Sequence, residues 1–466
     1  MKITLLNPRS YNYLNPLVFC GSMHNPGKQG SVVVIGLGYV GLPLACLSSS
    51  FYNVVGFDID QKKLDKINNC ICPLDEEYTK KLFAQYPIIA TSDPGVLHDA
   101  DIIVMCVPTP VDEHFNPDLG PVKGASATLA QQIRKGQLII IESTIYPGTT
   151  EEVIIPILEQ NPNQLKAGVD FGVAYCPERI DPGNKRWVLE TIPRVVGGLT
   201  EKDLNRAQHF YQSFIRAPLT PLRSLKAAEA VKILENTFRD VNIAFINEIA
   251  KSFDVLGIDV WEVIKGASTK PFGFMPLYPG PGVGGHCISV DPYYLIEKAD
   301  RSGFDHAFLK LARKINNSMP DYVVHLLESA LTRCGLDLQK TRVGILGLSY
   351  KAGVDDIRES PALKIIRLLL DKQVQVAVFD PHIVNTEMIF HHPLHASDKP
   401  KISLAKNLDA CLASCDALIL VTNHAEFLEQ EETISKHPIK VVLDTRNVLN
   451  KEKLEASGII YKGVGR

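Results

Sequence analysis

The chain has 466 residues, more than one compact core accommodates, so two or three domains are expected. Its 45% hydrophobic content is that of an ordinary globular protein, and a net charge of −3 argues against a nucleic-acid partner or an anionic membrane surface. The ten cysteines form no pair of CxxC units, which argues against a structural zinc site, and no metal is expected. Free cysteines in so long a chain favour a reducing, cytoplasmic location.

Residues 1–30 are expected to form an N-terminal extension ahead of the fold. They begin MKITLLNPRS and lack a continuous apolar segment that ends at a small-residue cleavage site. The most apolar stretch of the chain, Val32 to Leu47, is interrupted by glycines and a proline. It falls short of the ~20 residues that a bilayer span needs, so no membrane association is expected.

The stretch Ser31 to Asp60 predicts a strand, a tight turn, a helix and a second strand. Gly36, Gly38 and Gly41 form GxGxxG in the turn, and Asp58 ends the second strand. Glycines let backbone N–H groups approach a pyrophosphate, and an acid at this place accepts from ribose hydroxyls. The pattern predicts binding of NAD rather than NADP, although Lys63 is a cation that could meet a phosphate.

The same pattern recurs along the chain and predicts a doubly wound sheet in each half. Buried strands are expected within residues 100–110 and 136–148, and a second series within 342–353, 374–381, 415–423 and 439–447. The second series has GxxG and not GxGxxG, so its ligand is expected to differ from a second dinucleotide. Between the two series, Leu225 to Leu256 contains neither Gly nor Pro and predicts one long helix, or two nearly continuous ones, as a spine and a dimer surface.

The stretch PGPGVGGHCISVDP, Pro279 to Pro292, contains a candidate nucleophile, Cys287, behind two glycines and four residues before Asp291. A buried hydrophobic role for this cysteine is the alternative. Its neighbour His286 is as consistent with packing as with catalysis. Lys232 and Asn236 lie four residues apart, so they share a helix face and could hold an oxyanion. Thr144 after a strand and Glu178 in YCPER are further candidates, and surface roles for them stay open.

These motifs together resemble the nucleotide-sugar 6-dehydrogenases of the UDP-glucose/GDP-mannose dehydrogenase family. The resemblance extends from Ser31 to the C-terminus and rests on the following stretches: VIGLGYVGLPLA, CVPTP, ESTIYPGTT, CPER, EAVKILENTFRDVNIAFINE, PGPGVGGHCISVDP and GLSYKAGVDDIRESPA. It implies two Rossmann-like α/β domains joined by a central long-helix element. The implied bounds are an NAD-binding domain at 31–222, a central helical and dimerisation domain with the cysteine loop at 223–330, and a UDP-sugar-binding domain at 331–466.

The resemblance also implies roles for individual residues. Cys287 would be the nucleophile, Lys232 and Asn236 would stabilise an oxyanion and contact the substrate, and Asp291 would assist proton transfer. Glu178 and Thr144 would position or activate a hydrolytic water. Further contacts are implied to the substrate at Gly284 and Lys351, and to the cofactor at Gly36, Gly38, Tyr39, Val40, Gly41, Asp58, Lys63, Thr109 and Arg358.

The implied reaction is the four-electron oxidation of a C6 alcohol to a uronic acid by a homodimer. The stretch from Gly257 to Cys287 is most similar to UDP-N-acetylglucosamine 6-dehydrogenases, while UDP-N-acetylmannosamine and UDP-glucose remain alternatives. Pro182 and Val290 differ from the glucose branch, and Ser289 stands where relatives commonly have proline. Two other classes remain: an epimerase that uses Tyr294 of a YxxxK pair with Lys298, and a non-catalytic nucleotide-binding protein.

Overall fold

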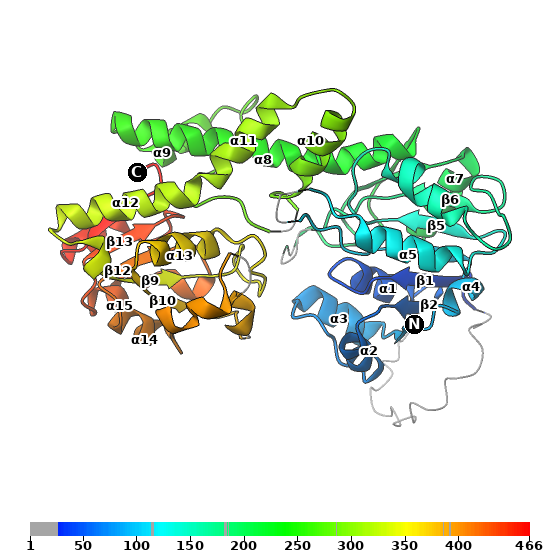
Figure 1. Ribbon diagram of the computed structural model, residues 1–466, viewed down its shortest axis with the longest axis horizontal. Coiled ribbons are helices and arrows are strands. Elements are labelled where there is room, and N and C mark those ends of the chain that lie inside the picture. Colours follow the sequence, from blue (N-terminus) through cyan, green and yellow to red (C-terminus); the bar gives the residue numbers. More distant parts are fainter. Residues whose placement is uncertain are drawn as a thin grey trace, which may run out of the picture.

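The computed structural model describes residues 27–112, 116–180, 184, 186–285, 287–384, 386–390 and 393–466. Two α/β units lie side by side, and one long helix, α8 (Leu225–Leu256), runs along an edge of both (Figure 1). Most of the predicted extension at 1–30, together with Pro182 and His286, lies outside the described residues. The predicted fold class, two doubly wound units joined by a long helix, is confirmed, and the predicted domain bounds stay predictions.

The first unit is built on an eight-stranded sheet of order β3-β2-β1-β4-β5-β6-β7-β8. All neighbouring strands run parallel except β6 and β7. Its strands are β1 (Ser31–Ile35), β2 (Asn53–Phe57), β3 (Ile89–Thr91), β4 (Ile102–Met105), β5 (Leu138–Ile141), β6 (Gly172–Tyr175), β7 (Arg194–Gly198) and β8 (Leu219–Leu222). Its helices are α1 (Gly41–Ser48), α2 (Gln61–Asn68), α3 (Glu77–Gln85), α4 (Val96–Asp99), α5 (Gly120–Ala130), α6 (Ile155–Leu158) and α7 (Glu201–Gln212).

The strands of this sheet are apolar without interruption because both faces are covered. Val32 and Val34 of β1 belong to one hydrophobic cluster, whereas Val33 and Ile35 belong to another on the opposite face. Successive side chains of a strand point to opposite faces, so each cluster takes every second residue. The helices therefore pack on both sides of the sheet, and its strand ends are left to form a ligand crevice.

The second unit repeats this arrangement with a parallel six-stranded sheet of order β11-β10-β9-β12-β13-β14. Its strands are β9 (Arg342–Leu346), β10 (Gln375–Phe379), β11 (Ile402–Leu404), β12 (Ala417–Leu420), β13 (Val441–Asp444) and β14 (Ile460–Gly463). Its helices are α12 (Met319–Arg333), α13 (Pro361–Asp371), α14 (Leu408–Ala413), α15 (Glu431–Ser435) and α16 (Lys451–Ala456). The predicted internal repeat is thus present as two sheets of related strand order.

The predicted long helix is a single helix of 32 residues. Ser224 caps its start by accepting from the N–H of Ala227, and Gly257 ends it with φ of +70°, a conformation that suits glycine. Leu225 and Ala228 at its start pack into the first unit, and Ile246 and Ala250 pack into the second. Three shorter helices accompany it: α9 (Val260–Ala267), α10 (Asp291–Arg301) and α11 (Ala307–Asn317).

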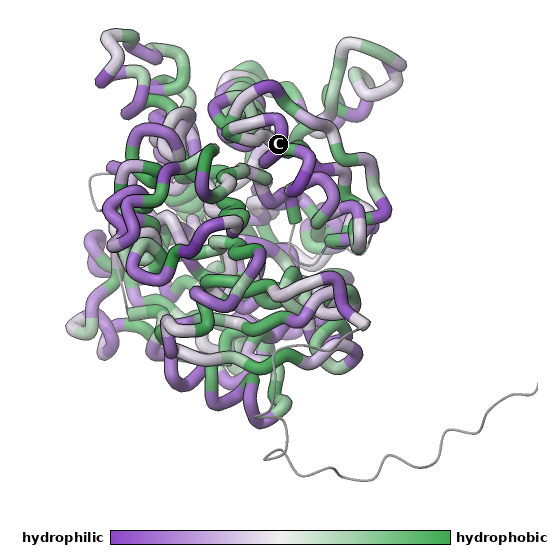
Figure 2. The backbone as a smooth tube through the Cα atoms, turned by 90° about the vertical axis from the view of Figure 1, so that its right-hand side faces the viewer, coloured by the Kyte–Doolittle hydropathy of each residue, from purple (hydrophilic) through white to green (hydrophobic). Residues whose placement is uncertain are grey.

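Among the described residues no helix is both long and apolar enough to cross a membrane. Figure 2 shows hydrophobic and hydrophilic stretches alternating closely along the described backbone. The nine cysteines of the described part of the chain are all free thiols.

Candidate active site

The glycine turn after β1 is shaped for a ligand. Gly36 has φ of +88°, and a Cβ there would lie 2.8 Å from the carbonyl oxygen of Cys106. A Cβ on Gly41 would lie 1.9 Å from the carbonyl oxygen of Gly36, so the turn closes against the start of α1. Gly38, in contrast, faces open space with no atom within 4 Å. The turn therefore presents bare backbone at the helix start, where a pyrophosphate binds.

Asp58 lies immediately after β2 and is 7% exposed. Its Oδ2 accepts from the N–H of Leu37 at 2.8 Å and from Nζ of Lys63 at 2.7 Å, and its Oδ1 accepts from the N–H of Asp60 at 3.0 Å. Burial raises the pKa of Asp58, but the bonds from Lys63 and the two amides outweigh it and lower the pKa. The carboxylate stays ionised, and Lys63 is engaged by it.

Four predicted catalytic residues meet at the start of α10. The carbonyl of Cys287 accepts from the N–H groups of Val290 at 3.1 Å and Asp291 at 2.8 Å, which places Asp291 one turn beyond the thiol. Asn236 on α8 donates to Oδ2 of Asp291. Lys232, one turn earlier on the same helix, is buried and close enough for its charge to act on both Cys287 and Asp291.

The electrostatics of this cluster are set by burial. Burial and the neighbouring Asp291 raise the pKa of Cys287 to about 11, although Lys232 and Arg358 oppose the rise. Burial also raises the pKa of Asp291 to about 6, against the effects of Lys232 and the bond from Asn236. At neutral pH the resting thiol is therefore protonated. Asp291 titrates near neutrality, which suits a group that accepts and returns protons.

The two glycines before Cys287 are required by contacts with the second unit. A Cβ on Gly284 would lie 2.8 Å from Cβ of Tyr350, and one on Gly285 would lie 2.8 Å from the Tyr350 ring. The N–H of Gly285 donates to the carbonyl of Arg358 at 3.0 Å, and the hydroxyl of Ser289 donates to the carbonyl of Gly285. The cysteine loop is thereby docked on the segment between β9 and α13.

Part of that segment, Tyr350 to Arg358, contains Lys351, which is predicted to contact the sugar nucleotide, and is called the sugar loop. Arg358 is half exposed (51%) and donates from Nε to Oδ1 of Asp356 at 2.9 Å. The hydroxyl of Tyr39, in the glycine turn, donates to Oδ1 of Asp355 at 3.1 Å. The structure thus brings the cofactor candidates Tyr39 and Arg358 to the same loop, and Lys351 lies in it as a half-buried side chain.

Glu178 lies in a buried charge cluster behind this site. It is 5% exposed and pairs with Arg194, which is fully buried and also donates to Oε1 of Glu142 at 3.0 Å. The hydroxyl of Tyr211 donates to the same oxygen of Glu142. Burial raises the pKa of Glu142 to about 7, against the effect of Arg194. Arg194 thus joins Glu178 and Glu142 in one buried cluster.

The remaining candidates line the same edge of the first sheet. Thr144 follows β5 and is half-buried, two residues beyond Glu142. Val40 occupies the N-cap position of α1 without a side-chain capping bond. The carbonyl of Thr109 accepts from the hydroxyl of Tyr294 at 2.9 Å.

Tyr294 of the YxxxK pair is a packing residue. It is fully buried, and its hydroxyl donates to the carbonyls of Thr109 and Pro110. Lys298 forms an ion pair with Glu152. With its hydroxyl donated to backbone, Tyr294 is not poised to exchange a proton with a sugar, which removes the support for the epimerase alternative.

Sequence reasoning missed Glu142, Arg194, Asp355 and Asp356. Arg194 opens the apolar strand RVVGG, and a buried arginine in such a strand needs carboxylate partners, so its position is a usable signal. Asp355 and Asp356 lie in the quoted GLSYKAGVDDIRESPA stretch, but only the fold shows what they contact.

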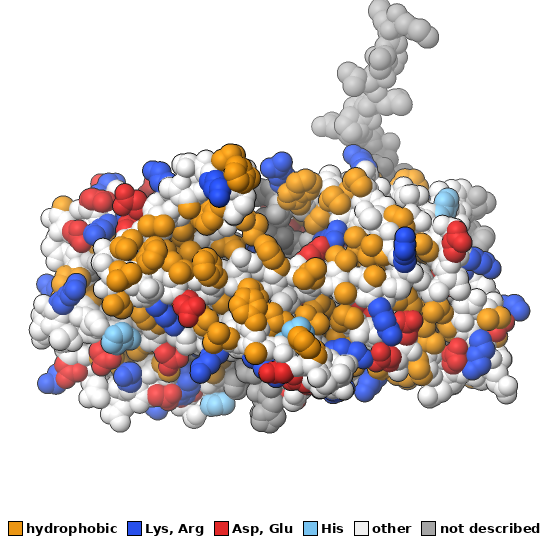
Figure 3. Space-filling view, turned by 90° about the horizontal axis from the view of Figure 1, so that it is seen from above, with side chains coloured by type: hydrophobic (Ala, Val, Ile, Leu, Met, Phe, Trp, Pro, Cys, Tyr) orange, Lys and Arg blue, Asp and Glu red, His pale blue; other side chains and the backbone are white. Residues whose placement is uncertain are grey.

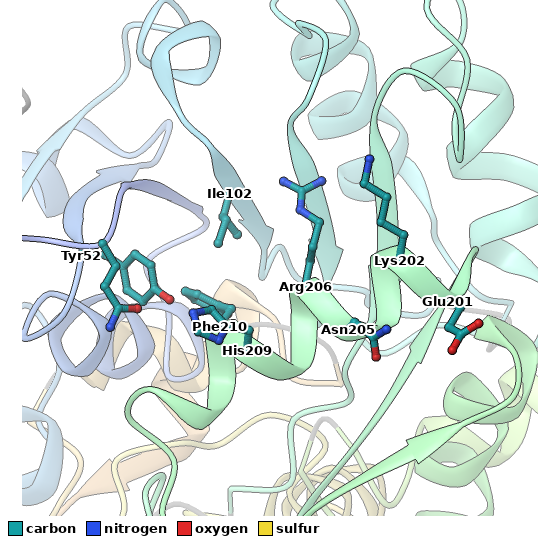
Figure 4. A pocket seen from close by; sticks show the side chains of 9 residues that line it. Tyr52, Ile102, Glu201, Lys202, Asn205, Arg206, His209 and Phe210 are labelled. Atoms are coloured by element: carbon teal, nitrogen blue, oxygen red, sulfur yellow. The ribbon is translucent and has the colours of Figure 1, made fainter.

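A separate cavity of about 870 Å³ lies at the opposite, amino-terminal edge of the first sheet. Figure 4 shows Ile102 at the start of β4 together with Lys202, Arg206 and His209 on α7. The Arg206 guanidinium donates to the carbonyls of Gly136 and Gln137. No predicted site residue lines this cavity, so it is distinct from the candidate active site.

The fold and the glycine turn define the class of protein: an α/β protein that binds a dinucleotide. The chain belongs to the UDP-glucose/GDP-mannose dehydrogenase family. Models of that family match its NAD binding domain at residues 30–215, its central domain at 226–318 and its UDP binding domain at 344–451. The chain is therefore an NAD-dependent UDP-sugar dehydrogenase, and the predicted family, enzyme class and cofactor are confirmed.

Two curated relatives are each 36% identical to this chain. The UDP-N-acetyl-D-glucosamine 6-dehydrogenase of Pseudomonas aeruginosa aligns over 91% of this chain and 99% of its own length. The UDP-N-acetyl-D-mannosamine dehydrogenase of Pyrococcus horikoshii aligns over 93% and 99%. Among solved structures, the UDP-D-ManNAc dehydrogenase of Pyrococcus horikoshii superposes with a TM-score of 0.83 at 35% identity, covering 94% of this chain and 99% of that one.

Proposed function

We propose that this enzyme oxidises the C6 alcohol of a UDP-N-acetylhexosamine to the uronic acid, with UDP-N-acetylglucosamine as the first substrate to test. The observation that carries the proposal is the meeting of Cys287, Asp291, Asn236 and Lys232 at one point between the two sheets. A thiol there can hold a reacting carbonyl covalently, and a lysine and an amide can stabilise the oxyanion that forms.

NAD supplies the hydride acceptor, once for each of the two oxidations. The alcohol becomes an aldehyde, and the Cys287 sulfur adds to its carbonyl carbon while Asp291 accepts the thiol proton. Lys232 and Asn236 stabilise the resulting oxyanion. Oxidation of this thiohemiacetal gives a thioester, which water hydrolyses to the carboxylate, and the thiol is regenerated. The sum is one alcohol, two NAD⁺ and one water converted to one carboxylate, two NADH and three protons.

The roles of Glu178 and Thr144 at the hydrolytic water stay predictions. The carboxylate of Glu178 accepts from the N–H of Ile180 and pairs with Arg194. The ion pair with Arg194 fixes the position from which the Glu178 carboxylate could orient a water. The substrate and cofactor contacts predicted for Gly284, Lys351 and Arg358 are supported by the docking of their loops on each other.

The relatives are named for both N-acetylglucosamine and N-acetylmannosamine substrates, so the test must separate the sugars. NADH formed per mole of limiting sugar is measured with UDP-N-acetylglucosamine, UDP-N-acetylmannosamine and UDP-glucose, for the wild type and Cys287→Ala. Two NADH from an N-acetylhexosamine, lost in the variant, is the expected result. One NADH would remove the thioester step, and turnover of UDP-glucose alone would overturn the substrate assignment.

We also propose that the enzyme is a homodimer that pairs through α8. Leu234, Phe238 and Phe245 lie on one face of this helix and are 66%, 50% and 57% exposed. Phe274 and Met275 border a groove of about 500 Å³ beside them. Figure 3, which views this side of the molecule, shows a broad patch of hydrophobic side chains. Exposed apolar surface of this extent marks an interaction site.

Sedimentation velocity tests the dimer. The wild type is expected to sediment as a dimer and Phe238→Glu as a monomer. Val384→Glu is the matched control, since Val384 is 92% exposed on the second unit, away from α8. A monomeric wild type would contradict the proposal. The cytoplasmic location remains a prediction, and the free thiols agree with it.

A further inference from the structure

The second sheet contains a counterpart of Asp58 that the proposed function leaves unused. Asp380 follows β10 as Asp58 follows β2, and it is 8% exposed. Its Oδ2 accepts from the N–H groups of Leu348 at 2.7 Å and Ser349 at 2.9 Å, and from the Ser349 hydroxyl at 3.0 Å. Nε2 of His424 lies 3.1 Å from the same oxygen. Asp380 is therefore fully engaged by its own chain.

His424 lies beyond β12 and is completely buried. Its Nδ1 lies 3.1 Å from the backbone nitrogen of Gly353. Because a backbone N–H can only donate, Nδ1 is the acceptor, and the ring proton must then be on Nε2, where it donates to Asp380. Asp380 thus selects the tautomer that leaves Nδ1 free to hold Gly353.

Gly353 is at the tip of the sugar loop. It is exposed, with φ of +72° and no atom within 4 Å of a Cβ position, so side-chain packing does not hold it. The base of the loop is closed by a bond from the N–H of Tyr350 to the carbonyl of Asp356 at 2.9 Å. The bond to His424 ties the tip to the sheet, two residues from Lys351.

The other side chains around His424 leave this arrangement intact. The His382 ring stacks on it with centroids 4.6 Å apart, and Phe427 meets it edge-on. Glu426 lies 3.3 Å from Nε2 of His382. His382, His424 and Glu426 are close enough to hold a metal ion, but both ring nitrogens of His424 are already bonded, so the cluster is not a cation site.

We propose that His424 is a positioning residue: its Nδ1 holds the sugar loop at Gly353 in the orientation that presents Lys351 to the nucleotide sugar. Asp380 is the group that orients the His424 ring. This inference rests on the proposed function, which assigns Lys351 to the substrate. His424 itself does not touch the reacting atoms.

Two matched variants separate the two bonds of the ring. In His424→Asn, Oδ1 takes the place of Nδ1 and still accepts from Gly353, while the bond to Asp380 is lost. In His424→Gln, the amide nitrogen takes the place of Nε2 and still donates to Asp380, while the bond from Gly353 is lost. Both variants fill the buried site with a polar side chain, so they are expected to fold alike.

Three measurements on the two variants show which bond of the His424 ring affects the sugar loop. Hydrogen–deuterium exchange of peptides covering 350–358 is expected to quicken in His424→Gln and to stay near wild type in His424→Asn. The dissociation constant of UDP and the KM for the sugar nucleotide are expected to rise about tenfold in His424→Gln and less than threefold in His424→Asn, with kcat changed less than KM. The dissociation constant of NAD and the melting temperature serve as controls.

Unchanged exchange and unchanged UDP affinity in His424→Gln would overturn the inference. So would equal losses of UDP affinity, NAD affinity and melting temperature in both variants, because that pattern describes a purely structural residue. Failure of the proposed function has a different signature: the wild type itself would neither bind UDP nor reduce NAD. The exchange data would still decide whether His424 holds the loop.

Discussion

The hydroxyl of Tyr39 donates to Oδ1 of Asp355 at 3.1 Å, which joins the glycine turn of the first sheet to the sugar loop of the second. Burial and the charge of Asp355 raise the pKa of Tyr39 well above its usual value, so it remains a hydroxyl donor. The glycine turn and the sugar loop are therefore joined by a direct hydrogen bond, in addition to the connection of the two units through α8.

We expect Tyr39→Phe to weaken this link. A partly buried bond to a carboxylate contributes about 1–3 kcal/mol, so the KM for the sugar nucleotide should rise about tenfold, while the fold is retained. Steady-state kinetics check the change. A double-mutant cycle with Asp355→Asn should show that the two effects are not additive, and additivity would mean that the bond does not couple the domains.

Asp58→Asn should relax the preference for NAD. The amide oxygen still accepts from Leu37, but the negative charge that repels a 2′-phosphate is gone, and Lys63 loses its partner. NADP is expected to gain at least tenfold in kcat/KM relative to NAD. Kinetics with both dinucleotides check this, and an unchanged ratio would show that Asp58 does not face the ribose.

Asp291→Asn should be inactive and more stable at neutral pH. The folded state raises the pKa of Asp291 to about 6, so between pH 4 and 6 it binds more protons than the unfolded chain. Stability therefore falls as pH rises through this window, by about 3 kcal/mol in total. Urea denaturation gives the free energy of unfolding at pH 5 and pH 8. The decrease in this free energy from pH 5 to pH 8 should be larger for the wild type than for Asp291→Asn. Wild-type kcat/KM should rise with pH through about 6.

Arg194→Met should destabilise the first unit strongly. Glu142 and Glu178 would remain buried without a cation, at a cost of about 3–5 kcal/mol. Adding Glu142→Gln should recover part of this loss because one carboxylate is removed. Arg342→Met, which removes the exposed partner of Asp416, is the control and should cost about 1 kcal/mol or less. Equal losses in both variants would refute the buried cluster.

The sequence predicted the features that local patterns encode. The glycine turn and Asp58 lie within one strand–helix–strand unit, Cys287 and Asp291 lie within one turn, and Lys232 and Asn236 are one helical turn apart. Long apolar strands also indicated both sheets. The bond between Asn236 and Asp291 spans 55 positions and that between Tyr39 and Asp355 spans 316, so no periodicity indicates either. The resemblance implies a substrate contact for Gly284, but no local pattern indicates that a Cβ on either glycine before Cys287 would meet Tyr350.

Asp58 and Asp380 occupy corresponding places in the two sheets, yet only Asp58 lies beside a turn that is open to a ligand. At Asp380, the donors that a ribose would offer are supplied by Ser349 and by the imidazole of His424. The place that a ribose hydroxyl would take beside Asp380 is thus occupied by donors of the chain itself. A carboxylate engaged in this way is not offered to a second NAD, which agrees with the match of this unit to a UDP binding domain.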